Sequence, residues 1–168
     1  NYVNAVKSAN QNGIPVSVEL LLQVQPRMLE LYDPTALANI SLKPKSNQYM
    51  APNVVDANSK YYKAELAYLA MLFSQEDCHI DNWIVGNEVN MPMSWYFTGS
   101  SDPVYNTNLY AVEYLNVYNA VRKYTSKSRV SFCFDHSWQH NDEGRGIAVK
   151  DYLNLLVQRI NESQPNVD

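Results

Sequence analysis

The stretch of sequence that decides the fold is IDNWIVGNEVN, residues 80–90. Its centre is a short apolar run from Trp83 to Val85, with polar residues on both sides. Such runs are typical of buried strands in parallel sheets. Side chains alternate between the two faces of a strand, so a regular strand puts Ile84 and Glu88 on the same face. The stretch therefore predicts a buried strand that ends on a carboxylate, where α/β barrels place their catalytic groups.

Helices and strands alternate on both sides of this stretch. Apolar and β-branched residues predict two more strands, at residues 14–22 and 129–135. Apolar residues spaced three and four apart predict amphipathic helices around them. These helices are expected at residues 2–11, 59–74, 109–125 and 147–162. Strands that are joined through helices form parallel sheets with right-handed crossovers, so the predicted fold class is α/β.

Two segments show little regular pattern. Residues 23–58 contain four prolines, and only a short helix is expected there, near residues 34–39. Loops of this length in a compact domain are usually functional. Residues 92–106 follow the central strand and carry several aromatic side chains, including Trp95 and Tyr96. Both segments are therefore candidates for function.

Composition limits the classes of protein that fit. Of the 168 residues, 46% are apolar and 18% are charged, which favours one folded domain over disorder. The formal net charge is −4 and the chain has no run of Lys and Arg, which argues against nucleic acid as a partner. No apolar run is long enough to span a membrane.

Cysteine and histidine give weak grounds for redox or metal chemistry. Cys78 and Cys133 lie outside any Cys-x-x-Cys motif, and we expect two buried or half-buried thiols. His136 and His140 are four residues apart, with Asp142 nearby. That spacing binds metal well mainly on one helix face, whereas here a strand leads into a polar loop. We therefore expect neither a metal site nor a cofactor.

Two motifs resemble those of a known class of enzymes. Residues 83–90, WIVGNEVN, are similar to the strand-four signature of the clan-A (β/α)8 retaining glycoside hydrolases, in which an Asn-Glu pair ends the strand. Further along, residues 135–138, DHSW, match the end of a following strand. Together the two motifs resemble an uncharacterised bacterial family assigned to hydrolases of this type. The resemblance covers nearly all of the chain, but only the middle of a full barrel.

The resemblance implies roles for several residues. Glu88 would be the general acid/base, and Asn87 would bind the 2-hydroxyl of the sugar. Retaining hydrolysis also needs a second carboxylate about 5–5.5 Å from the first, as the nucleophile. In the clan this nucleophile is a Glu on strand seven, which would lie beyond Asp168. We therefore expect the chain alone to hydrolyse nothing.

Five further side chains are expected to contact a carbohydrate. Flat rings and a few polar groups are typical of ligand clefts. The candidates follow the ends of the two strands, where ordinary packing at the barrel mouth is the alternative. They are Trp95, Tyr96, Asp135, His136 and Trp138.

Alignment with such a barrel gives strands three, four and five with their helices. A whole barrel usually needs about 250 residues, so residues 1–168 are expected to be a single incomplete domain, a partial TIM barrel from the centre of a catalytic domain. The expected partners are the remainder of this barrel, an oligosaccharide or polysaccharide substrate, and a second copy bound through open strand edges. The resemblance also implies a secreted or cell-surface location.

Two other readings stay open. The chain would be a non-catalytic carbohydrate-binding or structural barrel if its complete protein lacks the strand-seven Glu. A self-standing, flavodoxin-like α/β domain is a third reading. Such a domain usually binds its ligand through a Gly-rich phosphate loop at a topological switch point. The chain has only five glycines and no such loop motif, which weakens this reading.

Overall fold

Three parallel strands form the centre of the molecule, as the sequence predicts. The computed structural model describes residues 1–46, 49–140 and 145–167. The sheet has the order β1-β4-β5, so the strand from the deciding stretch lies in the middle. Each strand has four residues and is shorter than predicted, with bounds β1 Ser17–Leu20, β4 Asn82–Val85 and β5 Arg129–Phe132. The mixed α/β class with a parallel sheet is confirmed.

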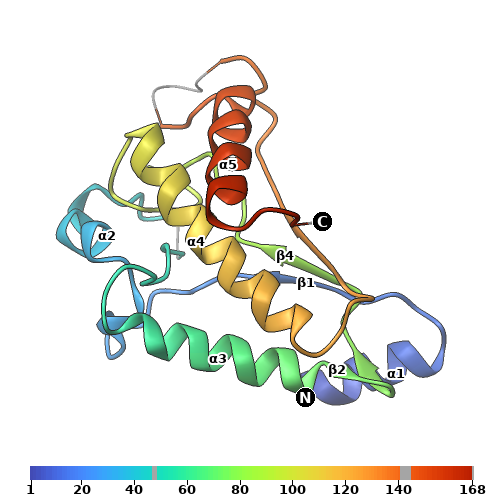
Figure 1. The fold of residues 1–168 in the computed structure, drawn as a ribbon. Helices are drawn as coiled ribbons and strands as arrows, with labels where there is room; N and C mark the ends of the chain where they lie inside the picture. The colour runs from blue at the N-terminus through green and yellow to red at the C-terminus, as the bar shows by residue number, and fades with distance from the viewer. Residues whose placement is uncertain (47–48, 141–144, 168) are drawn as a thin grey trace.

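The helices account for the buried face of this sheet. They are α1 Tyr2–Gln11, α3 Ser59–Leu72, α4 Pro103–Arg122 and α5 Val149–Ser163. Helices α3, α4 and α5 lie on one side of the strands, with α4 between the other two (Figure 1). Trp83 and Val85 point toward these helices and are fully buried. The register places Val18 and Val130 beside Trp83, so one face of all three strands contributes to the core.

The predicted helices are present, but one begins earlier than expected. Helix α4 begins at Pro103 rather than at residue 109, because Asp102 caps its amino end. The Asp102 side chain accepts a hydrogen bond from the Val104 amide at 2.9 Å. Pro103 occupies the first helical position, where no amide hydrogen is needed. The six extra residues carry no apolar stripe that the periodicity could reveal.

The apolar stripes of α3 and α5 pack as predicted. On α3, Tyr62 and Leu66 are buried, and Leu69 is half-buried. On α5, Leu156 and Ile160 are buried. Amphipathic helices gain most of their stability from such packing, so the periodicity was a sound guide for these two elements.

An antiparallel hairpin between α3 and β4 was not predicted. It joins β2 (Ser74–Gln75) to β3 (Cys78–His79). Each strand has only two residues, too few for alternation to be visible in the sequence. Cys78 is buried and Cys133 is half-buried, both as free thiols, which confirms the expectation for the two cysteines.

The long irregular segment forms a small core of its own. It contains α2 (Pro34–Ala38), close to the expected short helix, and the 3-10 turns η1 (Leu29–Leu31) and η2 (Ile40–Leu42). Tyr32, Met50 and Phe97 are buried together, so this segment packs on the aromatic loop after β4. An isolated bridge between Met50 and Phe97 fixes the contact.

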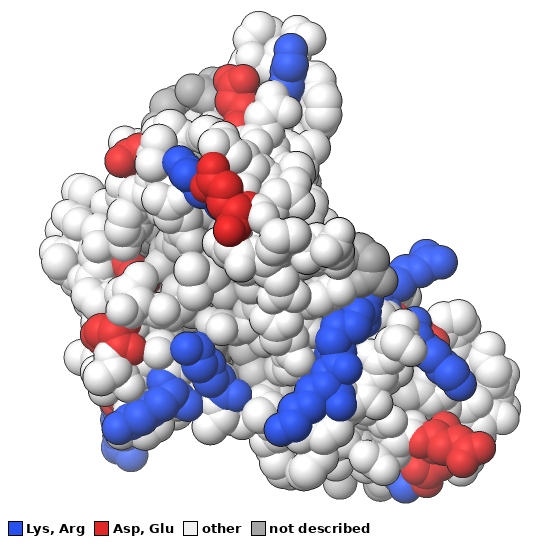
Figure 2. Space-filling model, in the orientation of Figure 1, with Lys and Arg blue, Asp and Glu red and all other residues white. Residues whose placement is uncertain are grey.

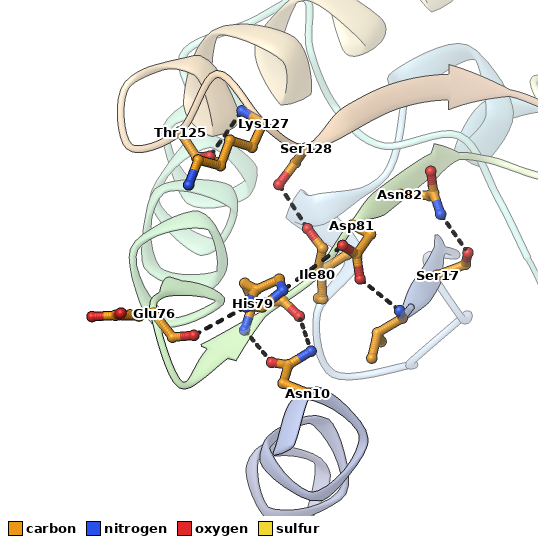
Figure 3. Close-up of polar contacts among 11 residues, drawn as sticks. Asn10, Ser17, Glu76, His79, Ile80, Asp81, Asn82, Thr125, Lys127 and Ser128 are labelled. Carbon is orange, nitrogen blue, oxygen red and sulfur yellow. Dashed lines mark hydrogen bonds and ion pairs between the residues drawn. The ribbon is translucent and has the colours of Figure 1, made fainter. Parts of the chain in front are cut away.

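Polar contacts fasten the three strands at their amino ends (Figure 3). The Asp81 carboxylate accepts a hydrogen bond from the Val16 amide at 2.7 Å, and the Asp81 carbonyl accepts one from the Arg129 amide at 2.7 Å. The Ser128 hydroxyl donates to the Ile80 carbonyl at 2.7 Å. These bonds set the register of β1 and β5 against β4 before the pleated pairing begins.

The second face of the sheet is mostly polar, and it is uncovered in the part of the chain that the structure describes. Its side chains are exposed or half-buried and include Ser17, Glu19, Asn82, Ile84, Arg129 and Ser131. Strands β1 and β5 each pair with β4 alone within the described ranges. Parallel sheets are rarely left open on one face.

Charge is scattered over the helix-covered side. In Figure 2, Lys and Arg side chains lie mostly in the lower half of the view, in separate groups with uncharged surface between them. Among the described residues, no helix is long and apolar enough to cross a membrane.

Candidate functional site

Glu88 lies just beyond the carboxyl end of the central strand. The strand was expected to continue to Glu88, but it stops at Val85. Gly86 then adopts a left-handed conformation with φ +69°, and Glu88 itself has φ +45°. The face-sharing of Ile84 and Glu88 expected of a regular strand therefore does not apply. Non-glycine residues in this region are strained by about 1–3 kcal/mol and persist only where their surroundings hold them.

Glycine is required at position 86. A Cβ atom there would lie 2.8 Å from Cγ1 of Val89 and 3.4 Å from Cδ2 of Tyr96. The left-handed φ adds a second reason, because only glycine adopts it without steric cost. The turn that follows β4 is thus defined by sequence and by packing together.

The surroundings of Glu88 favour its protonated form. Its side chain is half-buried. Burial is the main reason why the pKa of Glu88 lies above its ordinary value, and repulsion from Asp135 is the second. Glu19 on the neighbouring strand adds to the rise, whereas His136 opposes it. A carboxyl group with a raised pKa is suited to donate a proton.

The pKa of Asp135 is shifted in the opposite direction. Burial on its own would raise the pKa of Asp135, but hydrogen bonds from Asn90 and Ser137 outweigh it and lower the pKa. The Asn90 side-chain amide donates to Oδ1 of Asp135 at 2.8 Å, and the Ser137 backbone amide donates to the same oxygen at 2.9 Å. Asp135 is therefore a fixed negative charge near Glu88.

Asn90 joins the two strand ends. It is fully buried, and its side-chain oxygen accepts a hydrogen bond from the Asp135 amide at 3.0 Å. Its side-chain nitrogen also donates to the Ile147 carbonyl at 2.9 Å. Asn90 belongs to the deciding stretch, but the sequence motifs predict no role for it. Its place two residues after Glu88, in a segment otherwise occupied by site residues, was the available signal.

Asn87 and Trp95 lie close together in the segment that follows β4. Both line one small hollow, to which Tyr96 and Glu113 also contribute. Oδ1 of Asn87 accepts a weak hydrogen bond from the Cys133 thiol at 3.8 Å. The Trp95 side chain is 41% exposed, so its ring is available for stacking. The structure thus brings these two predicted residues together.

Tyr96 has a different environment from the one we expected. Its side chain is only 5% exposed, and its hydroxyl donates to Glu113 inside the core. The ring meets Tyr110 edge to face, with centroids 5.5 Å apart. Neighbouring residues in the aromatic loop point in different directions, and the sequence did not indicate which of the two rings would be buried. Tyr96 is therefore a core residue next to the site, and its ring is not presented to solvent.

His136 and Trp138 lie on the β5 side, in a concave stretch of surface made by residues 136–140. Both are exposed, and Trp138 is 52% exposed. Asp142, which we considered with the two histidines, lies outside the described residues. Within the described ranges, no group of three or more His, Cys, Asp or Glu side chains is arranged to hold a metal ion.

A buried carboxyl group on α4 was missed. Glu113 is 3% exposed and lies among the phenol rings of Tyr62 and Tyr96. Burial raises its pKa to about 7, although the hydrogen bonds from both tyrosines oppose the rise. Its position within an apolar helical stretch was the only sequence signal.

Fold and site together define a class: an α/β protein whose parallel strands bring a half-buried carboxyl group, Glu88, and its polar neighbours to one edge of the sheet. The chain belongs to a family of unknown function, DUF5722, whose match covers residues 1–168. No curated protein and no solved structure matches the chain.

Proposed function

We propose that this chain is the central part of a (β/α)8 barrel of a retaining glycoside hydrolase, in which Glu88 is the general acid/base. The observation that carries the proposal is the contrast between Glu88 and Asp135. One carboxyl group has a raised pKa and the other a lowered pKa, at the ends of adjacent parallel strands. Such divergent pairs mark acid/base sites.

The uncovered face of the sheet supports the proposal that the chain is part of a barrel. Helices cover one face of the strands, while the other presents polar side chains such as Glu19, Asn82 and Ser131. A barrel would close this face inward and pair both edge strands, which removes the exposed backbone groups. Strands three, four and five would then be β1, β4 and β5.

The chemistry would proceed in two steps. Protonated Glu88 donates its proton to the glycosidic oxygen as the bond to the sugar breaks. A second carboxylate, supplied by a later strand of the barrel, attacks the anomeric carbon. Ionised Glu88 then removes a proton from the water that releases the sugar. Asn87 would bind the 2-hydroxyl, and the Trp95 ring would stack against the sugar.

Glu88→Gln in the full-length protein tests this role. The variant cannot donate a proton, so we expect turnover of alkyl glycosides to fall by about 100-fold or more, since positioned acid/base groups contribute that much. Aryl glycosides with good leaving groups should be less affected in the first step. The measurement is kcat/KM on both substrate types.

Glu76→Gln is the matched control. Glu76 is exposed in the hairpin at the opposite end of the sheet (Figure 3), so the same chemical change there should leave turnover unchanged. Unchanged turnover in Glu88→Gln would remove Glu88 from the acid/base role.

Carbohydrate binding without catalysis is the second candidate. The two exposed indole rings, Trp95 and Trp138, favour it because stacking on a sugar needs no carboxyl group. In that case oligosaccharides would bind to the full-length protein, and Glu88→Gln would bind them equally well with no turnover by either form.

A further inference from the structure

We propose that Glu113 is a positioning residue for Glu88, acting through Tyr96 on the turn that follows β4. This inference rests on the proposed function, because it assigns Glu113 a part in placing the proposed acid/base. Glu113 lies on α4, is buried, and lines the same small hollow as Asn87 and Trp95.

Glu113 is held by two hydrogen bonds inside the core. Each of its two carboxyl oxygens accepts one phenol hydroxyl, Oε1 from Tyr62 at 3.1 Å and Oε2 from Tyr96. All three side chains are buried. A buried carboxyl group is a costly way to fill space, since apolar side chains of similar volume usually stabilise a core as well or better. The two hydrogen bonds of Glu113 fix the orientations of the Tyr62 and Tyr96 rings, which an apolar side chain would not do.

The ring of Tyr96 packs against the turn that follows β4. A Cβ atom on Gly86 would lie 3.4 Å from Cδ2 of Tyr96, so the ring is in contact with this glycine. Tyr110 packs edge-on against Tyr96, and its hydroxyl donates to the Val85 carbonyl at 2.6 Å. The two rings therefore hold the peptide between Val85 and Gly86, immediately before Asn87 and Glu88.

Two backbone hydrogen bonds also link Tyr96 to Glu88. The Tyr96 amide donates to the Met91 carbonyl at 3.2 Å, and the Met91 amide donates to the Glu88 carbonyl at 2.8 Å. The left-handed φ of Glu88 needs such support, because it is not a conformation that the residue prefers. Loss of the Tyr96 hydroxyl should let the ring shift and relax this turn.

Tyr62 provides a matched control within the same cluster. Tyr62→Phe and Tyr96→Phe each remove one of the two hydrogen bonds that the Glu113 carboxyl group accepts. The Tyr96 ring lies against Gly86 in the turn, whereas Tyr62 is part of α3. A role confined to core packing would make the two variants behave alike, whereas positioning separates them.

The experiment compares both variants in the full-length protein by two readouts. The first is the pKa of Glu88, followed by NMR of carbon-13-labelled glutamate carboxyl groups. We expect Tyr96→Phe to move the pKa of Glu88 back toward its ordinary value and Tyr62→Phe to leave it in place. The second is kcat on a glycoside that the wild-type protein turns over. We expect Tyr96→Phe to lower kcat by about tenfold or more, because small misplacements of a catalytic group have large effects, with little change in KM.

The conservative variant adds a rescue test. Glu113→Gln keeps polar contacts to both phenol groups, so it should preserve the pKa of Glu88 better than Glu113→Leu. Equal shifts in Tyr62→Phe and Tyr96→Phe, or no shift in either, would overturn the positioning role. The NMR readout does not depend on catalysis, so a protein without hydrolase activity would refute the proposed function while the positioning of Glu88 is still decided.

Discussion

A carboxyl group buried among phenol rings makes the stability of this protein depend on pH. The pKa of Glu113 is raised from 4.5 to about 7 in the folded state. Between these values the folded protein keeps a proton that the unfolded chain has released. The free energy of unfolding therefore falls as pH rises from about 4.5 to about 7, by up to about 3 kcal/mol from this residue.

Glu113→Gln should flatten this dependence, because glutamine does not ionise. Urea unfolding at pH 5 and at pH 8 measures the effect, and the difference between the two pH values should shrink in the variant. Glu76→Gln makes the same chemical change at an exposed position and should leave the difference as it is. Parallel behaviour of Glu113→Gln and wild type would contradict the assignment.

At the scale of elements, the cap of α4 adds to the stability that the helix gains from packing. Asp102 accepts a hydrogen bond from the first turn of the helix, and its negative charge also favours the helix amino end. We expect Asp102→Ala to lower the free energy of unfolding by about 1 kcal/mol. Thermal or urea unfolding would show this directly.

Asn58 at the start of α3 is the natural comparison, since its side chain makes no capping hydrogen bond. Asn58→Ala should therefore have a smaller effect than Asp102→Ala. Equal losses in the two variants would mean that the Asp102 hydrogen bond does not stabilise α4.

The elements also show how far sequence reasoning reaches. Periodicity located α3 and α5 because their buried residues repeat at helical spacing, and the apolar runs located all three parallel strands. Periodicity did not show where α4 begins, because a polar cap at Asp102 sets that boundary. It also did not show the hairpin Ser74–His79, whose strands are too short for alternation to be visible.

The site could be predicted only in part. The motifs located Glu88, Asn87 and Asp135 near the carboxyl edge because parallel strands end together there. They did not show that Tyr96 turns inward, nor that Glu113 from a helix meets it. Such contacts depend on side-chain directions in an irregular loop, which no periodic pattern encodes.

At the scale of the whole molecule, the open sheet favours association. Strands β1 and β5 have free outer edges within the described part of the chain, and exposed edges bind other strands. We expect residues 1–168, expressed alone, to form dimers or larger species whose proportion rises with concentration in sedimentation experiments. The full-length protein, with its proposed barrel closed, should not. A monomer at every concentration for residues 1–168 would contradict this expectation.

The fastening of the strands at their amino ends has a further consequence. Asp81 and Ser128 hold the sheet in register at the rim opposite to Glu88. The register of the strands is therefore set independently of the loops at the carboxyl rim. Substitution of Trp95, or of residues around Trp138, should therefore leave the pairing of the three strands intact.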